Sequence, residues 1–410
     1  MAAEPTSDAA RTRRTPIRSA LSRPGIARLL VLSVIARLPF GAVTILLVLR
    51  TRELGGGYSD AGVVVATFAV VSAATEPFIA RLVDRVGQST VLAGAVPLNL
   101  AAFLAAAAIP AAWPIAALAV AGAAIGLTYP QIGGMVRALL IALLEEGDER
   151  HAAFSLESGA VELQFVVAPP LLVTVVAGTT SAAVGLVVGG VVAAIGGALF
   201  AATPWSRAWR PVERADGAAR DRLAASGFAM LVALMLVMGL GFGALEVGTT
   251  AFAEHEGHRS LAGVLFALSA VGSLVGAVLS ARFGAPRNQG ARLAGLLAFQ
   301  AATTALLALP HGLPLMAALI AFNGLSIAPA VSTIYALAAR TVPASRITEG
   351  YGWLGLGIMG GSSVGAVIAG ALTTETSTAA AFLAPAAIVG LGWLATVRTF
   401  GRRWAEPAPS

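Results

Sequence analysis

The stretch Ala80-Arg81-Leu82-Val83-Asp84-Arg85-Val86-Gly87-Gln88 lies between two long apolar segments. Alternating charges followed by a glycine are typical of a tight turn, and apolar sequence on both sides places such a turn at a membrane surface. The segments before and after it are therefore predicted to cross the membrane. The arginines of the turn indicate which side faces the cytoplasm.

Composition places the rest of the chain in the same class. Of the 410 residues, 57% are hydrophobic and only 12% are charged, and the mean hydropathy is +0.82. That much apolar surface needs lipid as its solvent, and apolar runs long enough to cross a bilayer recur along the chain. We predict an all-α membrane protein that is multi-pass in the cell membrane (plasma or inner) and surrounded by membrane lipid.

Several chemistries are excluded by residue types that are missing. The sequence has no Cys and no Lys, so all 27 basic residues are Arg, which leaves no disulfide, no thiolate metal site and no P-loop lysine. The arginines are spread over short loops, which argues against nucleic acid as a partner. All four His lie in predicted loops and no Asp lies centrally in a span, so we expect no metal, no cofactor and no enzyme activity.

Hydropathy predicts twelve transmembrane helices in two pseudo-symmetric six-helix bundles. The predicted spans are 29–49, 61–80, 91–109, 113–135, 155–177, 182–202, 228–249, 261–280, 291–309, 313–337, 352–372 and 379–397. The expected domains are a disordered cytoplasmic tail (1–27), a first bundle (28–203), a cytoplasmic linker (204–224), a second bundle (225–398) and a cytoplasmic tail (399–410). With both termini cytoplasmic, 23 of the 27 Arg fall on the cytoplasmic side, as the positive-inside rule requires.

Short matches at an offset of 201 or 202 residues indicate an internal duplication. Phe40-Gly41-Ala42 matches Phe242-Gly243-Ala244, and Ala80-Arg81 matches Ala281-Arg282. A third match joins 61–63 to 262–264. Two repeats in the same orientation predict a binding site between the bundles, near the middle of the membrane.

With these features the chain resembles the major facilitator superfamily over essentially its whole length. The turn after the second span lines up with the family's G-x-x-x-D-R-x-G-R-R motif at Asp84, Arg85 and Gly87, whereas Ala80 replaces the first Gly and Gln88-Ser89 replace the basic pair. The resemblance implies that Asp84 and Arg85 belong to a cytoplasmic gate that holds the two halves together. The alternative is that the arginines of this turn only anchor the topology.

Ionisable residues at membrane depth are costly and are therefore functional candidates. Four stand out within spans: Arg37, Glu76, Glu162 and Glu246. Arg37 and Glu162 lie at similar depths, roughly 10–12 Å from the cytoplasmic end at 1.5 Å per residue. We therefore expect them to pair, either as a proton-coupling device or as a permanent ion pair. Glu246 lies within a glycine-rich helical stretch (239–248), and we expect it either to bind a cationic substrate or a proton or to be hydrated near the outer rim.

The remaining site candidates are weaker. Glu76, which precedes Pro77 near the cytoplasmic end, fits an interface residue better than a substrate ligand. Gln131, Gln164 and Asn323 are polar residues within spans that line a cavity or join two helices.

The preferred function is secondary active transport of a small organic molecule by alternating access, with proton-coupled efflux as the favoured direction. The efflux direction rests on the resemblance alone. Proton-coupled or facilitated uptake is an alternative, and a sensor or scaffold with a transporter fold is an alternative of another class. The expected partners are a small-molecule substrate and protons, and the protein is expected to act as a monomer.

Overall fold

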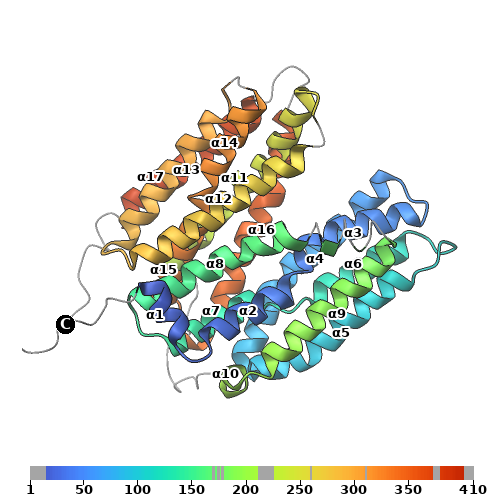
Figure 1. The fold of residues 1–410 in the computed structure, drawn as a ribbon, viewed down its shortest axis with the longest axis horizontal. Helices are drawn as coiled ribbons and strands as arrows, with labels where there is room; N and C mark the ends of the chain where they lie inside the picture. The colour runs from blue at the N-terminus through green and yellow to red at the C-terminus, as the bar shows by residue number, and fades with distance from the viewer. Residues whose placement is uncertain are drawn as a thin grey trace, which may run out of the picture.

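The computed structural model describes residues 15–168, 171, 172, 176, 180–210, 226–258, 261–309, 312–372 and 379–400, and its regular elements there are helices (Figure 1). We call residues 15–210 the first half and residues 226–400 the second half. The first half contains α1 (Pro16–Ser22), α2 (Ile26–Arg37), α3 (Phe40–Glu53), α4 (Tyr58–Val86), α5 (Gln88–Ala108), α6 (Ala116–Thr128), α7 (Ile132–Leu143), α8 (Asp148–Ala168), α9 (Ala182–Ala201) and α10 (Pro204–Ala208). The second half contains α11 (Ser226–His255), α12 (Ala262–Phe283), α13 (Gln289–Leu306), α14 (Leu313–Gly324), α15 (Ile327–Thr341), the 3-10 turn η3 (Ala344–Arg346), α16 (Ile347–Leu372) and α17 (Ala379–Phe400).

Several predicted spans are each built from two helical pieces. α2 ends at Arg37 and α3 begins at Phe40 because Pro39 lies between them and has no N–H to continue the hydrogen-bond ladder. α6 ends before Tyr129, which adopts an extended conformation, as the residue preceding a proline usually does. These breaks leave irregular backbone inside apolar segments, and such backbone is tolerated where it lines a cavity.

In the described part of the chain, ten helical segments are long and apolar enough to cross a membrane. They correspond to ten of the twelve predicted spans. The fifth and ninth predicted spans fall on α8 and α13, which lie along α12 and α17 respectively but carry more polar residues. Twelve crossings therefore remain a prediction.

The tail expected at residues 1–27 is partly helical, which corrects the expectation of disorder for residues 16–22. α1 begins with a proline at its first turn, buries Ala20 and packs against α8. The Ser19 hydroxyl donates to Glu149 Oε1 at 2.5 Å, and Arg23 Nε lies 2.7 Å from Glu149 Oε2. These contacts explain why the segment is ordered despite its polar sequence. Residues 1–14 lie outside the described residues.

The hydrophobic cores show how the two halves are joined. One core contains buried residues of both halves, among them Leu139, Phe154, Tyr335 and Tyr351. The core around Phe68 and Phe103 contains residues of the first half only, and the core around Phe252 and Phe382 contains residues of the second half only. We call the end with the shared core the joined end and the opposite end the separated end. In Figure 1 the two groups of helices converge near α1, α7 and α15 and diverge toward α3 and α14.

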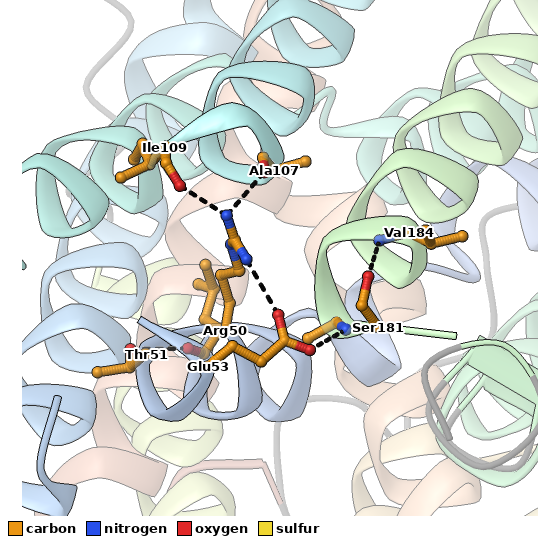
Figure 2. A network of polar contacts seen from close by, with 9 residues as sticks. Arg50, Thr51, Glu53, Ala107, Ile109, Ser181 and Val184 are labelled. Carbon is orange, nitrogen blue, oxygen red and sulfur yellow. Dashed lines mark hydrogen bonds and ion pairs between the residues drawn. The ribbon is translucent and has the colours of Figure 1, made fainter. Parts of the chain in front are cut away.

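At the separated end, a polar network ties three helix ends of the first half together (Figure 2). Arg50, near the end of α3, donates through Nη2 to the carbonyl oxygens of Ala107 at 3.0 Å and Ile109 at 2.6 Å, at the end of α5. Its Nη1 atom lies 3.1 Å from Glu53 Oε2, and Glu53 Oε1 accepts the first N–H of α9, from Ala182, at 2.5 Å. A cation at a helix C-terminus and an anion at a helix N-terminus are both favourable.

Within the second half, α11 and α16 touch backbone to backbone. A Cβ atom placed on Gly239 or Gly243 would overlap the carbonyl oxygens of Ile358 or Ser362. Conversely, a Cβ on Gly361 would overlap a carbonyl oxygen of α11. Small residues let membrane helices approach this closely, and these glycines therefore fix the spacing of the two helices.

A candidate transport cavity and its charged groups

A cavity of about 810 Å³ lies between the two halves, on the separated side of the shared core. The first half lines it from α2, α3, α4, α7 and α8, and the second half from α11, α12, α15 and α16. Its volume is in the range of sites that hold drug-sized molecules. The lining is mainly apolar and aromatic, with four charged side chains: Arg37, Glu76, Arg137 and Glu246.

The aromatic lining is arranged in local clusters. The Phe40 ring lies 5.0 Å from the Tyr129 ring and 6.0 Å from the Phe68 ring, measured between centroids, in the first half. In the second half, Phe242 and Phe266 meet edge to face at 5.4 Å. Such rings offer a ligand a large apolar surface and the negative faces of their π systems.

The two cavity arginines share one buried carboxylate. Arg37 Nη1 lies 2.9 Å from Glu157 Oε1, and Arg137 Nη2 lies 2.5 Å from Glu157 Oε2. Glu157 is 0% exposed, and the two arginines are 7% and 5% exposed. The Arg137 guanidinium also stacks on the Tyr335 ring at 3.6 Å. A buried charge persists only when it is paired, and this triad pairs two cations with one anion.

The predicted pairing of Arg37 with Glu162 is wrong, because Arg37 pairs with Glu157. The Arg37 side chain folds back toward the start of its own helix, where Nε donates to the Ser33 carbonyl oxygen at 3.1 Å. This places the guanidinium about one turn nearer the joined end than its Cα. Glu157, five residues before Glu162 in α8, lies at that level.

Glu162 faces the second half instead of the cavity. It is 8% exposed, and its Oε1 atom accepts a hydrogen bond from the Ser273 hydroxyl of α12 at 2.8 Å. The Ser273 oxygen in turn accepts the N–H of Ala328 at 3.1 Å. Glu162 therefore lies in a contact between α8 and α12 that also includes Ser155 and Ser280, whose hydroxyl oxygens are 2.9 Å apart.

Glu76 and Glu246 both line the cavity, one from each half. Neither forms an ion pair within the described residues. Glu76 is half-buried and packs over Gly355 of α16, so it is both a cavity residue and an interface residue. Glu246 is exposed on the cavity wall, one helical turn from Phe242.

The neutral polar candidates separate into two groups. Gln131 and Gln164 line the cavity. Asn323 is buried and does not line it, because its Nδ2 atom donates to the Thr303 hydroxyl at 2.8 Å and the Thr304 hydroxyl at 2.9 Å. Asn323 therefore joins α14 to α13.

The predicted gate turn does connect the halves, through Asp84. Its carboxylate accepts the N–H of Thr348 at 3.2 Å and the N–H of Glu349 at 2.7 Å, at the start of α16. Unpaired N–H groups at a helix N-terminus favour an anion. Gly87 ends α4 with φ +92°, a conformation that disfavours a side chain.

The arginine that reaches the second half is Arg81, whereas Arg85 is exposed. Arg81 Nη2 lies 2.6 Å from Glu349 Oε1, and Arg346 Nη2 lies 2.8 Å from the same oxygen. Glu349 is 1% exposed and so is well enclosed by these partners. Where the family's motif has a basic pair, Gln88 donates to the Met135 carbonyl oxygen at 3.1 Å, a contact within the first half.

A second set of contacts joins the halves between α8 and the α12–α13 region. Asp148 Oδ1 accepts the N–H of Ala285 at 2.7 Å. Arg292 Nη1 lies 3.0 Å from His151 Nε2 and its Nη2 donates to the Ser280 hydroxyl at 2.5 Å. Glu146 also pairs with Arg340. The joined end is thus held by polar contacts on two sides of the shared core.

Sequence reasoning missed Glu157, Arg137 and Glu349. Glu157 and Arg137 were detectable as opposite charges inside or beside apolar runs. Glu349 had no such signal, because it lies in the polar stretch between two predicted spans and not within an apolar run. Among the described residues, no group of three His, Asp or Glu side chains is arranged to hold a metal ion.

Comparisons with known proteins agree with this architecture. The sequence matches the Major Facilitator Superfamily over residues 29–289 and again over residues 259–410. A bacterial homologue of the iron transporter ferroportin, solved in an outward-facing state with soaked iron, is similar in structure with a TM-score of 0.72 and 17% identity over 92% of this chain and 99% of that one. The human organic anion transporter MFSD10 (TETRAN) has a TM-score of 0.71 and 15% identity over 93% of this chain and 100% of that one.

A search of curated proteins found no match. The two solved structures are less than 25% identical to this chain, so they establish the fold and not the substrate. The family match covers nearly the whole sequence. The chain therefore belongs to the major facilitator superfamily of membrane transporters.

Proposed function

We propose that this protein is a secondary active transporter that moves a small organic molecule by alternating access, with proton-coupled efflux as its direction. The observation that carries the proposal is the cavity of about 810 Å³ lined by both halves. A site shared by two bodies opens to one side or the other when the bodies rock, whereas a site within one body does not.

The hydrophobic cores and the distribution of arginines support one assignment of the side to which the cavity opens. The shared core and the Asp84 contacts close the joined end, and each half has a core of its own at the separated end. The Arg distribution supports a cytoplasmic position for the joined end, which contains the Arg81 turn. We therefore assign this conformation as open to the outside.

Proton coupling is supported by the two cavity carboxylates. Glu76 and Glu246 are the acidic residues of the lining and form no ion pair within the described residues, so we expect each to take up or release a proton as the cavity changes sides. A proton-coupling pair of Arg37 and Glu162 is no longer supported, because Arg37 forms its ion pair with Glu157. The Asp84 turn supplies the gate.

Vesicles containing the purified protein test the proposal. A panel of small organic molecules is added with an imposed pH gradient, and internal pH is followed with a dye. An exporter driven by protons should move at least one compound against inward proton flow. Compound movement only along the proton flow would assign uptake, and binding without any movement would assign a sensor.

A further inference from the structure

We infer that the cavity takes an amphiphilic organic cation whose positive group is bound by Glu246 and Glu76. The inference deepens the proposed function, since it assigns a substrate class to the same cavity. It depends on which cavity charges are already neutralised.

The two arginines of the lining already form ion pairs within the protein. Arg37 and Arg137 both pair with Glu157, and the flat face of Arg137 is covered by the Tyr335 ring. A second donor of Arg37, Nη2, is used by the Ser33 hydroxyl at 3.1 Å. A substrate anion would have to compete with a carboxylate that is already held at ion-pair distance and shielded from water.

The carboxylates of the lining have no partner at ion-pair distance among the described residues, although Arg137 lies near enough to Glu76 for an electrostatic interaction. Glu246 is exposed to the cavity and Glu76 is half-buried, and neither forms an ion pair among the described residues. When Glu76 and Glu246 are both ionised, the groups in and behind the lining, counting Glu157 and the two arginines, carry one more negative charge than positive. A cation is therefore the ion that this cavity attracts.

The surroundings of the carboxylates favour a cation with a large apolar part. Phe242 lies one turn from Glu246 and packs against Phe266, while Phe40 and Phe68 line the opposite half. Aromatic faces attract cations, and they bury apolar surface that a small hydrated ion lacks. Open space remains next to Gly263, which also lines the cavity.

The two carboxylates lie on different halves, Glu76 on α4 and Glu246 on α11. A ligand that contacts both is sensitive to the movement of one half against the other. A cationic substrate bound by both carboxylates would therefore favour one arrangement of the halves over another.

A pair of probes with the same shape and opposite charge tests the substrate class. Radiolabelled tetraphenylphosphonium and tetraphenylborate are measured by equilibrium dialysis against the purified full chain in a neutral detergent, with an excess of unlabelled probe to define specific binding. We expect specific binding of the cation to be at least about tenfold tighter than that of the anion. Equal binding, tighter binding of the anion, or no specific binding of the cation would overturn the inference.

Variants locate the site. E246Q and E76Q should each weaken binding of tetraphenylphosphonium by about tenfold or more, and E246D should retain part of it. E256Q, which removes an exposed carboxylate outside the cavity lining, should bind like the unmodified protein. Unchanged binding in both E246Q and E76Q would contradict the inference, provided that each variant elutes as a single species.

The result separates this inference from the proposed function. Charge-selective binding that depends on the two carboxylates, without any transport in vesicles, would reject transport and keep the substrate class. Proton-driven transport of a neutral or anionic compound, without binding of the cation, would support the proposed transport and reject the cationic substrate class.

Discussion

Asp84 Oδ2 accepts the backbone N–H of Glu349 at 2.7 Å, and this hydrogen bond joins the last turn of α4 to the first turn of α16. The two residues are 265 positions apart, one in each half of the chain. Because the contact spans the two halves, we expect it to break when the joined end opens. Its removal should therefore shift the protein toward the state in which that end opens.

We expect D84A to lower the ratio of the state open to the outside over the state open to the inside by at least about tenfold, because it removes two hydrogen bonds to a carboxylate and a loss of about 1.4 kcal/mol already corresponds to a factor of ten. The chain has no Cys, so S363C introduces a single thiol on the cavity wall. Labelling of S363C from outside intact cells by a membrane-impermeant maleimide should slow in D84A. R85A, which alters an exposed arginine of the same turn, is the control, and equal slowing there would count against the assignment.

Removal of the single anion of the Arg37, Glu157 and Arg137 triad should destabilise the protein strongly. E157Q leaves two buried guanidinium groups with no anion between them, and removing one partner of a buried ion pair costs about 3–5 kcal/mol. Thermal unfolding in detergent should show a clearly lower midpoint for E157Q. E145Q alters an exposed carboxylate and should change the free energy of unfolding by less than about 0.5 kcal/mol. A midpoint for E157Q that equals the E145Q value would contradict the pairing.

E162Q should retain transport that depends on the proton gradient. The glutamine oxygen can still accept a hydrogen bond from the Ser273 hydroxyl, and the side chain does not line the cavity. E162A, in contrast, should lose about 1–3 kcal/mol of stability because it leaves that buried hydroxyl without its acceptor. Both are read out by vesicle transport and thermal unfolding. Loss of gradient dependence in E162Q alone would return Glu162 to the coupling mechanism.

The network at the separated end should stabilise the first half without affecting binding. R50A removes two hydrogen bonds to the carbonyl oxygens at the end of α5 (Figure 2) and should lower the free energy of unfolding by about 1–3 kcal/mol. Tetraphenylphosphonium binding should be unchanged, since Arg50 does not line the cavity. T67A, which removes an exposed hydroxyl bonded only within its own helix, serves as the control.

The fold was largely predictable because membrane-spanning helices are recognisable in a sequence as long apolar runs. A contact between the halves at Asp84 was predictable from the resemblance of its turn to the family's motif. The identity of its partner was not, because the N–H groups at the start of α16 belong to the backbone and carry no sequence signal. Likewise, the sequence does not reveal which face of α4 points toward the second half, so it could not predict that Arg81 pairs with Glu349 while Arg85 is exposed.

The error at Arg37 has a specific physical origin. Depth was measured between Cα positions from the predicted start of the fifth span at Ser155, whereas α8 begins at Asp148. Arg is long enough for its charge to lie a full turn away from its own Cα, and the sequence does not reveal the direction in which the side chain folds. Depth matching therefore selected Glu162 when the side chain reaches Glu157.

The direct backbone contact between α11 and α16 limits how this transporter can change shape. Helices whose main chains touch have no layer of side chains between them that could rearrange. We therefore expect the contacts at Gly239, Gly243 and Gly361 to make α11 and α16 move as one rigid unit. Because α16 carries the Asp84 contact and α11 carries Glu246, we expect any movement of α16 that separates the halves at the joined end to displace Glu246 as well.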